Sequence, residues 1–216
     1  MIRLENISWL AGAFRLDGVS FAVPAGSYGV LMGRTGSGKT SLVEIICGLR
    51  QSTTGSVMIG ERDVTELAPG ERGIGYVPQD GAMFPTMTVR EQIGFALRLR
   101  HRPAGEIEQR VRELSEHLGV AHLLDRRPDG LSGGERQRVA LGLALAAKPA
   151  VLLLDEPLSA LDEEMRDDVG SLLKRIQREL KLTALHITHS RREAAQLADV
   201  VLRLEGGSVR EEQPKD

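Results

Sequence analysis

Residues 33–40 carry the clearest chemical signal in the sequence. They read GRTGSGKT and fit the pattern G-x-x-x-x-G-K-[ST], in which backbone N–H groups fold around a phosphate at the start of a helix. We expect Lys39 to reach the β- and γ-phosphates of a nucleotide, and the Thr40 hydroxyl to bind Mg²⁺. The predicted nucleotide contacts come from the whole loop: Gly33, Arg34, Thr35, Gly36, Ser37, Gly38, Lys39 and Thr40.

A second pattern places two adjacent acids at the end of an apolar run. Residues 151–154 read VLLL and are followed by Asp155 and Glu156. Ligands bind beyond the carboxyl ends of the strands in open α/β sheets, so Asp155 is placed to hold Mg²⁺ through its water shell. Glu156 would polarise an attacking water as the catalytic base. Together with the phosphate loop, these acids predict a nucleoside triphosphatase.

A third pattern predicts a second anion site. Residues 131–137 read LSGGERQ, and the Ser132 hydroxyl with the Gly133 and Gly134 N–H groups would lie at the start of a helix. Ser132 and Glu135 also fit a capping box. Both interpretations can hold, because the cap geometry exposes the donors.

These three motifs closely resemble those of the ATPases of the ABC transporter family. The resemblance implies ATP and Mg²⁺ as ligands and a head-to-tail dimer, in which the LSGGERQ segment of one copy closes on ATP held by the phosphate loop of the other. It also assigns γ-phosphate sensing to Gln79, which would help to bind Mg²⁺ as well, and to His189. Residues 159–162, which end at Asp162, would cross the dimer interface. Lys39, Gln79, Glu156 and His189 are thus the expected catalytic residues.

Two further segments resemble importer ATPases for molybdate, tungstate, sulfate and sugars. They are DVTEL at 63–67 and FPTMTVRE at 84–91. The resemblance implies solute import through a separate permease, with a solute-binding protein in the full system. Met83, Phe84 and Met87 would form an apolar groove for the permease, although they could equally be local core. A regulatory ATPase that gates a membrane partner, or an exporter ATPase, is the alternative.

The sequence departs from the family at three points. Ala11 occupies the position where an aromatic side chain stacks on adenine, so Trp9 or Phe14 would replace it. Arg34 stands where a small residue is common. No C-terminal regulatory domain is expected in residues 1–216, so inhibition through such a domain is not expected either.

Composition limits the function classes. The chain of 216 residues has a net charge of −2 and a pI near 6.2, which argues against nucleic acid as a partner. Cys47 is the single cysteine, so no internal disulfide can form. The longest apolar stretch, residues 139–147, is far short of the roughly 18 residues that span a bilayer. Together with this limit, the resemblance to ABC transporter ATPases implies a cytoplasmic protein peripheral to the inner face of the membrane.

The elements that position these motifs predict an α/β fold. Strands are expected at 2–7, 14–23, 28–32, 56–59, 73–77, 151–155, 183–188 and 200–204, and helices at 39–49, 89–100, 105–119, 134–147, 162–180 and 191–197. We predict a P-loop NTPase with a RecA-like parallel-sheet core, an N-terminal antiparallel β part and an inserted α-helical subdomain. The core would comprise residues 1–78 and 148–216, and the helical subdomain about 79–147. The loop 63–72 and the polar tail 209–216 are expected to lack strands.

Overall fold

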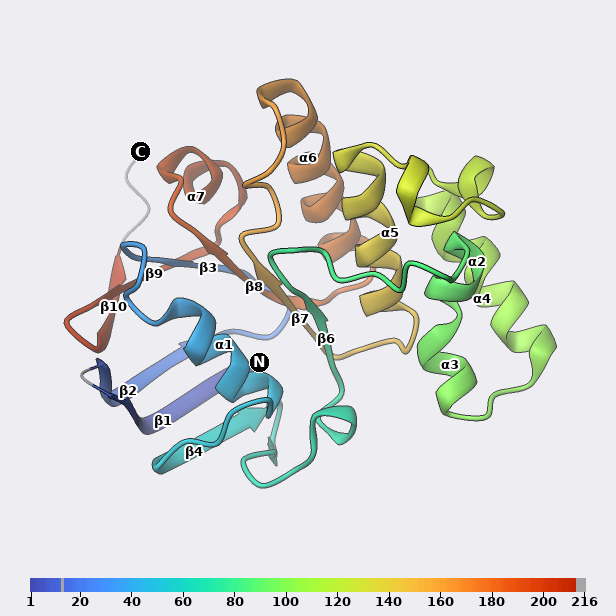
Figure 1. The fold of residues 1–216 in the computed structure, drawn as a ribbon. Helices are drawn as coiled ribbons and strands as arrows, with labels where there is room; N and C mark the ends of the chain where they lie inside the picture. Colours follow the sequence, from blue (N-terminus) through green and yellow to red (C-terminus); the bar gives the residue numbers. More distant parts are fainter. Residues whose placement is uncertain (13, 213–216) are drawn as a thin grey trace.

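A computed structural model describes residues 1–12 and 14–212 (Figure 1). The strands are β1 (Ile2–Ala11), β2 (Phe14–Val23), β3 (Tyr28–Met32), β4 (Thr54–Ile59), β5 (Arg62–Asp63), β6 (Ile74–Val77), β7 (Val151–Asp155), β8 (Thr183–Thr188), β9 (Val200–Glu205) and β10 (Ser208–Glu212). The helices are α1 (Lys39–Cys47), α2 (Val89–Ile93), α3 (Phe95–Leu99), α4 (Ala104–His117), α5 (Gly133–Leu145), α6 (Glu163–Glu179) and α7 (Arg191–Leu197), with the short 3-10 helices η1 (Pro69–Glu71), η2 (Ala121–Leu123) and η3 (Pro128–Gly130). In this described part of the chain, no helix is both long and apolar enough to cross a bilayer.

A six-stranded sheet forms the centre of the molecule, in the order β10-β9-β3-β8-β7-β6. All pairs are parallel except β10 with β9. Every residue of β3 and β7 is buried, because both faces of the sheet are covered. Alternate residues therefore enter different cores: Leu153 packs on one face, and Leu152 and Leu154 pack on the other.

One face of this sheet packs against α1 and a second, antiparallel sheet in the order β2-β1-β4-β5. Alternating apolar residues of β1 and β2, such as Ile2, Leu4 and Leu16, point into this core. The α1 side chains Leu42 and Ile46 are fully buried here. This layer holds the phosphate loop against the sheet.

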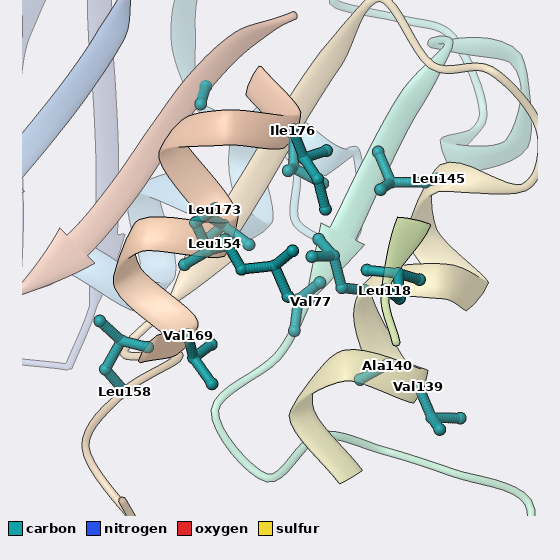
Figure 2. Packing of buried hydrophobic residues seen from close by; sticks show 14 of the residues in the cluster. Val77, Leu118, Val139, Ala140, Leu145, Leu154, Leu158, Val169, Leu173 and Ile176 are labelled. Atoms are coloured by element: carbon teal, nitrogen blue, oxygen red, sulfur yellow. The ribbon is translucent and has the colours of Figure 1, made fainter. Parts of the chain in front are cut away.

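The other face packs against α5, α6 and α7, and the same core continues to α2 and α4 (Figure 2). Leu154 of β7, Val139 of α5 and Leu173 of α6 belong to this core. The segment between β6 and β7 contains α2–α5, and Figure 1 shows α2, α3 and α4 at the end of the molecule away from β1, β2 and β4. The predicted α/β architecture, with an antiparallel part and helices between β6 and β7, matches this arrangement.

Three predicted elements differ from the structure. The helix expected at 89–100 is interrupted at Gly94, a poor helix former, and becomes α2 and α3. The loop expected at 63–72 begins in the short strand β5, and the tail expected to fray from residue 209 instead continues β10 to Glu212. Both strands gain ladder hydrogen bonds from a neighbour, β4 or β9, and Arg203 donates to Glu212 at 3.1 Å across the β9–β10 pair. Pairing with a preformed strand outweighs the polar composition of these segments. Residues 213–216 lie outside the described residues.

A buried arginine, Arg72, connects the loop before β6 to the C-terminal end of α1. Arg72 is 6% exposed, and its guanidinium donates to the carbonyls of Ile45 and Ile46 at 2.9 Å each, of Leu67 at 2.9 Å and of Thr65 at 2.7 Å. Burial lowers the pKa of Arg72. It caps the C-terminal turn of α1, whose own last turn has no basic residue.

Replacing Arg72 with methionine should destabilise the fold. The variant keeps much of the side-chain volume but leaves two buried and two partly buried carbonyls without this donor, which should cost about 3 kcal/mol or more. For a chain of this size, that loss lowers Tm by roughly 6–12 °C. Calorimetry on Arg72→Met and Arg62→Met checks this, because Arg62 is exposed and makes a single carbonyl contact at 3.2 Å. Equal melting temperatures for the two variants would show that the Arg72 hydrogen bonds do not stabilise the fold.

Candidate functional site

The residues predicted to do chemistry lie along one edge of the parallel sheet. Strands β3, β8, β7 and β6 are neighbours and run in the same direction, so their carboxyl ends meet at this edge. The phosphate loop follows β3, His189 follows β8, Glu156 follows β7, and Gln79 follows β6. The topology thus brings together residues that are up to 156 positions apart in the sequence, from Gly33 to His189.

The phosphate loop is shaped around Lys39. The Lys39 side chain is only 5% exposed, and its ammonium donates to the carbonyls of Gly33 at 3.0 Å and Arg34 at 3.1 Å. Gly38 has φ 95°, a conformation that favours glycine, and begins α1 without a side-chain cap. The first N–H groups of α1 therefore have no capping acceptor from this residue and face the loop. Arg34, Thr35 and Gly36 are exposed, as is Thr40.

An aromatic pair lies beside this loop. A Cβ at position 38 would lie 2.3 Å from Cζ of Phe14, so the Phe14 ring packs directly on Gly38. The ring centroids of Trp9 and Phe14 are 6.1 Å apart. Trp9 also carries the guanidinium of Arg50 at 4.5 Å from its ring centroid, whereas Ala11 is exposed. Of the two candidate aromatics, Phe14 contacts the loop itself.

Asp155 and Thr40 form an oxygen-rich corner under the loop. The Thr40 hydroxyl bonds to the Asp155 carboxyl, which is 1% exposed. Burial raises the pKa of Asp155, the hydrogen bond from Thr40 and the charge of Lys39 oppose this shift, and the charge of Glu156 adds to it. Asp155 Oδ1 is one of the buried polar atoms in the described residues that have no hydrogen-bond partner. A buried, unpartnered carboxylate oxygen beside a hydroxyl fits a hard cation such as Mg²⁺, which would favour the charged carboxylate.

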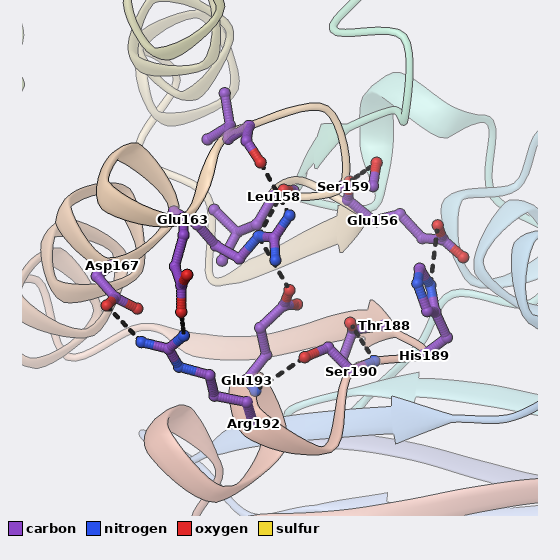
Figure 3. A network of polar contacts seen from close by, with 12 residues as sticks. Glu156, Leu158, Ser159, Glu163, Asp167, Thr188, His189, Ser190, Arg192 and Glu193 are labelled. Carbon is purple, nitrogen blue, oxygen red and sulfur yellow. Dashed lines mark hydrogen bonds and ion pairs between the residues drawn. The ribbon is translucent and has the colours of Figure 1, made fainter.

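Glu156 and His189 face each other across the ends of β7 and β8 (Figure 3). Glu156 Oε2 lies 3.5 Å from His189 Nδ1, and the His189 side chain is 62% exposed. Glu156 has φ 45°, an unusual conformation for a residue with a side chain, which costs of order 1–3 kcal/mol. Its N–H donates to the Ile187 carbonyl at 3.0 Å and holds this conformation. The turn directs Glu156 away from Asp155, so the two acids can take different roles.

The LSGGERQ segment forms the predicted capping box. The Glu135 N–H donates to Ser132 Oγ at 3.3 Å, and Glu135 Oε2 accepts from the Ser132 N–H at 2.7 Å. These bonds to Ser132 hold the pKa of Glu135 below its usual range. Ser132 and Gly133 are exposed at the start of α5, so their donors can reach an external anion. The hydroxyl still caps its own helix.

Gly134 has a packing role that sequence reasoning missed. A Cβ at this position would lie 2.5 Å from Sδ of Met165 on α6. The glycine therefore lets the first turn of α5 approach α6 closely. The run Ser-Gly-Gly gives no sign of this contact, because Met165 is 31 residues away.

Other predicted positions have clear structural surroundings. Asp162 is the N-cap of α6 and accepts from the Met165 N–H at 2.9 Å. Gln79 is exposed in the loop after β6.

Cys47 is buried, and its burial raises the pKa of the thiol to about 12, which matches a structural residue. His186 is buried as well, and its Nδ1 lies 2.9 Å from the Tyr28 hydroxyl.

The predicted permease groove is only partly open. Phe84 is 39% exposed, and its ring centroid lies 4.6 Å from that of Phe95. Met83 is partly buried and packs on the helical core, and Met87 is also partly buried. The exposed apolar contact surface at this site is therefore centred on Phe84.

Sequence reasoning also missed Arg166 and Glu193. Arg166 donates to the Leu158 carbonyl at 3.3 Å and the Leu161 carbonyl at 2.8 Å, which holds the loop between Glu156 and α6. Glu193 is buried, with Arg166 3.9 Å away. Neither residue belongs to a short motif. A weak signal does exist, because Arg166 follows the Asp162 cap by one helical turn.

Comparison with curated proteins finds importer subunits. The molybdate/tungstate import ATP-binding protein WtpC of Thermococcus kodakarensis is 45% identical over 201 residues, which cover 93% of this chain and 61% of the relative. A protein of the same name from Archaeoglobus fulgidus is 48% identical over 198 residues, covering 92% of this chain and 81% of the relative. The sulfoquinovosyl glycerol transport ATP-binding protein SmoE of Agrobacterium fabrum is 41% identical, covering 96% of this chain and 58% of the relative. The chain thus spans about three fifths of the length of the first of these relatives.

A solved structure and a family model agree with these relatives. The dimeric structure of a post-hydrolysis state of the ATP-binding cassette MJ0796, bound to ADP and Pi, has a TM-score of 0.86 at 29% identity over 100% of both chains. A model of the ABC transporter family matches residues 16–159, which contain the phosphate loop, the LSGGERQ segment and both acids. The resemblance and the fold class predicted from the three motifs are confirmed, and this chain belongs to the ABC transporter family.

Proposed function

We propose that the chain is the ATP-binding and ATP-hydrolysing subunit of an importer, and that it works as a head-to-tail dimer under a separate permease. The observation that carries this proposal is the separation of two phosphate-binding helix starts. The phosphate loop begins α1, which covers one face of the six-stranded sheet, and Ser132 begins α5, which covers the other. Only the first has a lysine and the acids beside it. A second copy can bring its Ser132 to this loop.

Each residue at the sheet edge then has a role. Residues 33–40 hold the phosphates, Lys39 neutralises their charge, and Thr40 with Asp155 holds Mg²⁺, with Gln79 as a further ligand. A bound Mg²⁺ would neutralise charge on the phosphate oxygens. Glu156 accepts the proton of the attacking water, and His189 beside it contacts the γ-phosphate. Catalysis is mainly positioning and electrostatic stabilisation.

The remaining contacts concern the dimer and the membrane partner. Ser132, Gly133 and Gly134 of one copy would bind the γ-phosphate held by the other, with Asp162 at the interface. Phe84 and its neighbours Met83 and Met87 on the helical subdomain, residues 79–147, would receive the permease. The adenine would stack on Phe14, which contacts the loop. The names of curated import relatives support an oxyanion such as molybdate, tungstate or sulfate as the solute. A solute-binding protein would deliver this solute, and the chain would lie at the inner face of the membrane.

Replacing Ser132 with arginine tests the role of the second helix start. The bulky side chain would enter the interface, so ATP turnover should fall at least about 100-fold while each copy still binds ATP through its own loop. Turnover and equilibrium ATP binding are to be measured on the same preparation. Ser171→Arg is the matched control, since Ser171 is exposed on α6 away from the sheet edge. Near-normal turnover in Ser132→Arg would exclude a shared site.

A further inference from the structure

Glu193 on α7 (Figure 3) and Arg166 on α6 form a partly buried ion pair. Glu193 Oε1 lies 3.9 Å from Arg166 Nε, and the Glu193 side chain is 8% exposed while the Arg166 side chain is 33% exposed. Each partner also contacts a different part of the sheet edge. The pair therefore lies between two functional segments rather than at the surface.

On one side, Arg166 fixes the loop that leads from Glu156 to α6. Its guanidinium donates to the carbonyls of Leu158 at 3.3 Å and Leu161 at 2.8 Å. The same loop is tied to the catalytic end of β7, because Ser159 Oγ donates to the Glu156 carbonyl at 2.9 Å. The loop ends at the Asp162 cap of α6. Its position is thus set by Arg166 on one side and by Glu156 on the other.

On the other side, Glu193 holds the end of β8. Its Oε2 lies 3.4 Å from His186 Nε2, and the nearby Thr188 helps to lower the pKa of the same carboxylate. His189 is the next residue after Thr188. Ser190 then caps α7 by accepting from the Glu193 N–H at 3.3 Å. Glu193 is therefore bound to the residues that flank His189.

The charge state of this network follows from its contacts. Burial opposes ionisation of Glu193, but the hydrogen bonds from His186 and Thr188 and the charges of His186 and Arg166 outweigh it and lower its pKa. Burial and the Glu193 charge raise the pKa of Tyr28, whose hydroxyl lies 2.9 Å from His186 Nδ1. The carboxylate and guanidinium are both charged.

Helices α6 and α7 are also joined by exposed ion pairs of Arg192. These pairs provide a control for substitutions of Arg166 and Glu193. Arg192 pairs with Glu163, and with Asp167 at 2.6 Å. Its side chain is half exposed and reaches neither the loop carbonyls nor β8. Exposed pairs of this kind contribute little to stability.

We propose that Arg166 and Glu193 are positioning residues that make the His189 end of β8 and the loop 158–162 move as one unit. The inference rests on the proposed function, in which His189 contacts the γ-phosphate and this loop faces the second copy. Contact of His189 with ATP would then adjust the loop at the dimer interface through two side chains. Segments that contact the two partners of one ion pair can shift together rather than independently.

Measuring both kcat and the KM for ATP distinguishes a positioning role of Arg166 and Glu193 from a purely structural role. Glu193→Gln keeps the shape of the side chain, and Arg166→Met keeps its length. Each should lower kcat at least about fivefold while the KM for ATP changes by less than about twofold, because ground-state binding is untouched. In the double variant, kcat should fall no further than in the worse single variant, since both break one connection. Arg192→Met should retain kcat within about twofold of the original chain.

Assays well below each variant's melting temperature keep loss of folding out of the comparison. If Arg166→Met does not fold, the kcat of Glu193→Gln alone tests the proposed connection, because this substitution removes a charge without opening a cavity. A folded Glu193→Gln with unchanged kcat would overturn the connection, and so would effects that multiply in the double variant. Glu156→Gln distinguishes the two proposals. If it retains turnover, the catalytic assignment fails, and if it is inactive while Glu193→Gln is fully active, only the connection fails.

Discussion

Glu156→Gln should reduce ATP turnover at least about 1000-fold and leave ATP binding intact. Glutamine has the size of glutamate and can hold the same backbone conformation at φ 45°, but it cannot accept the proton of the attacking water. The phosphate loop, Asp155 and Thr40 are unchanged, so nucleotide affinity should stay within about threefold. Phosphate release and equilibrium binding of ATP are the measurements.

The control for this substitution is Glu61→Gln. Glu61 is exposed in the turn between β4 and β5, so its variant should hydrolyse ATP at the original rate. His189 lies 3.5 Å from Glu156 and stays in place in both variants. Full activity in Glu156→Gln would show that another group is the base.

Lys39→Met should weaken ATP binding at least about 100-fold. The lysine is 5% exposed and provides a desolvated positive charge where the phosphates are expected, and charge-assisted bonds in such a site contribute about 1.5–3 kcal/mol each. Two loop carbonyls, those of Gly33 and Arg34, also lose their donor. Methionine fills a similar volume, so the fold should remain intact. Calorimetric titration with ATP and Mg²⁺ measures the affinity.

Lys148→Met is the matched control. Lys148 is exposed and precedes β7, at the sheet edge opposite the phosphate loop. Its variant should bind ATP with unchanged affinity. A loss of affinity of the same size in both variants would point to net charge rather than to the loop as the cause.

Much of the fold and most of the site could be predicted from local patterns. The phosphate loop, the two acids after β7 and the Ser132 cap are short motifs whose geometry is set by neighbouring residues. The convergence of the phosphate loop and the two acids at one edge also followed, because parallel strands align their carboxyl ends.

Long-range contacts could not be predicted in this way. Arg72 is an ordinary arginine in a polar loop, and its partners at Ile45 and Ile46 are 27 and 26 residues away. Gly134 has a neighbour on another helix, and β10 forms only because β9 offers a free edge. The Arg72 contacts, the Gly134 contact and strand β10 all depend on tertiary packing, which cannot be predicted from periodicity and composition.

The molecular mass of Glu156→Gln in solution tests the head-to-tail dimer most directly. The chain has a mass of 23.5 kDa. With saturating ATP and Mg²⁺, the variant cannot hydrolyse the nucleotide that joins the two copies, so light scattering should show twice this mass. Without nucleotide, or with Ser132→Arg added, the mass should remain that of one chain. A variant that binds ATP at saturation and still has the mass of a single chain would contradict the dimer.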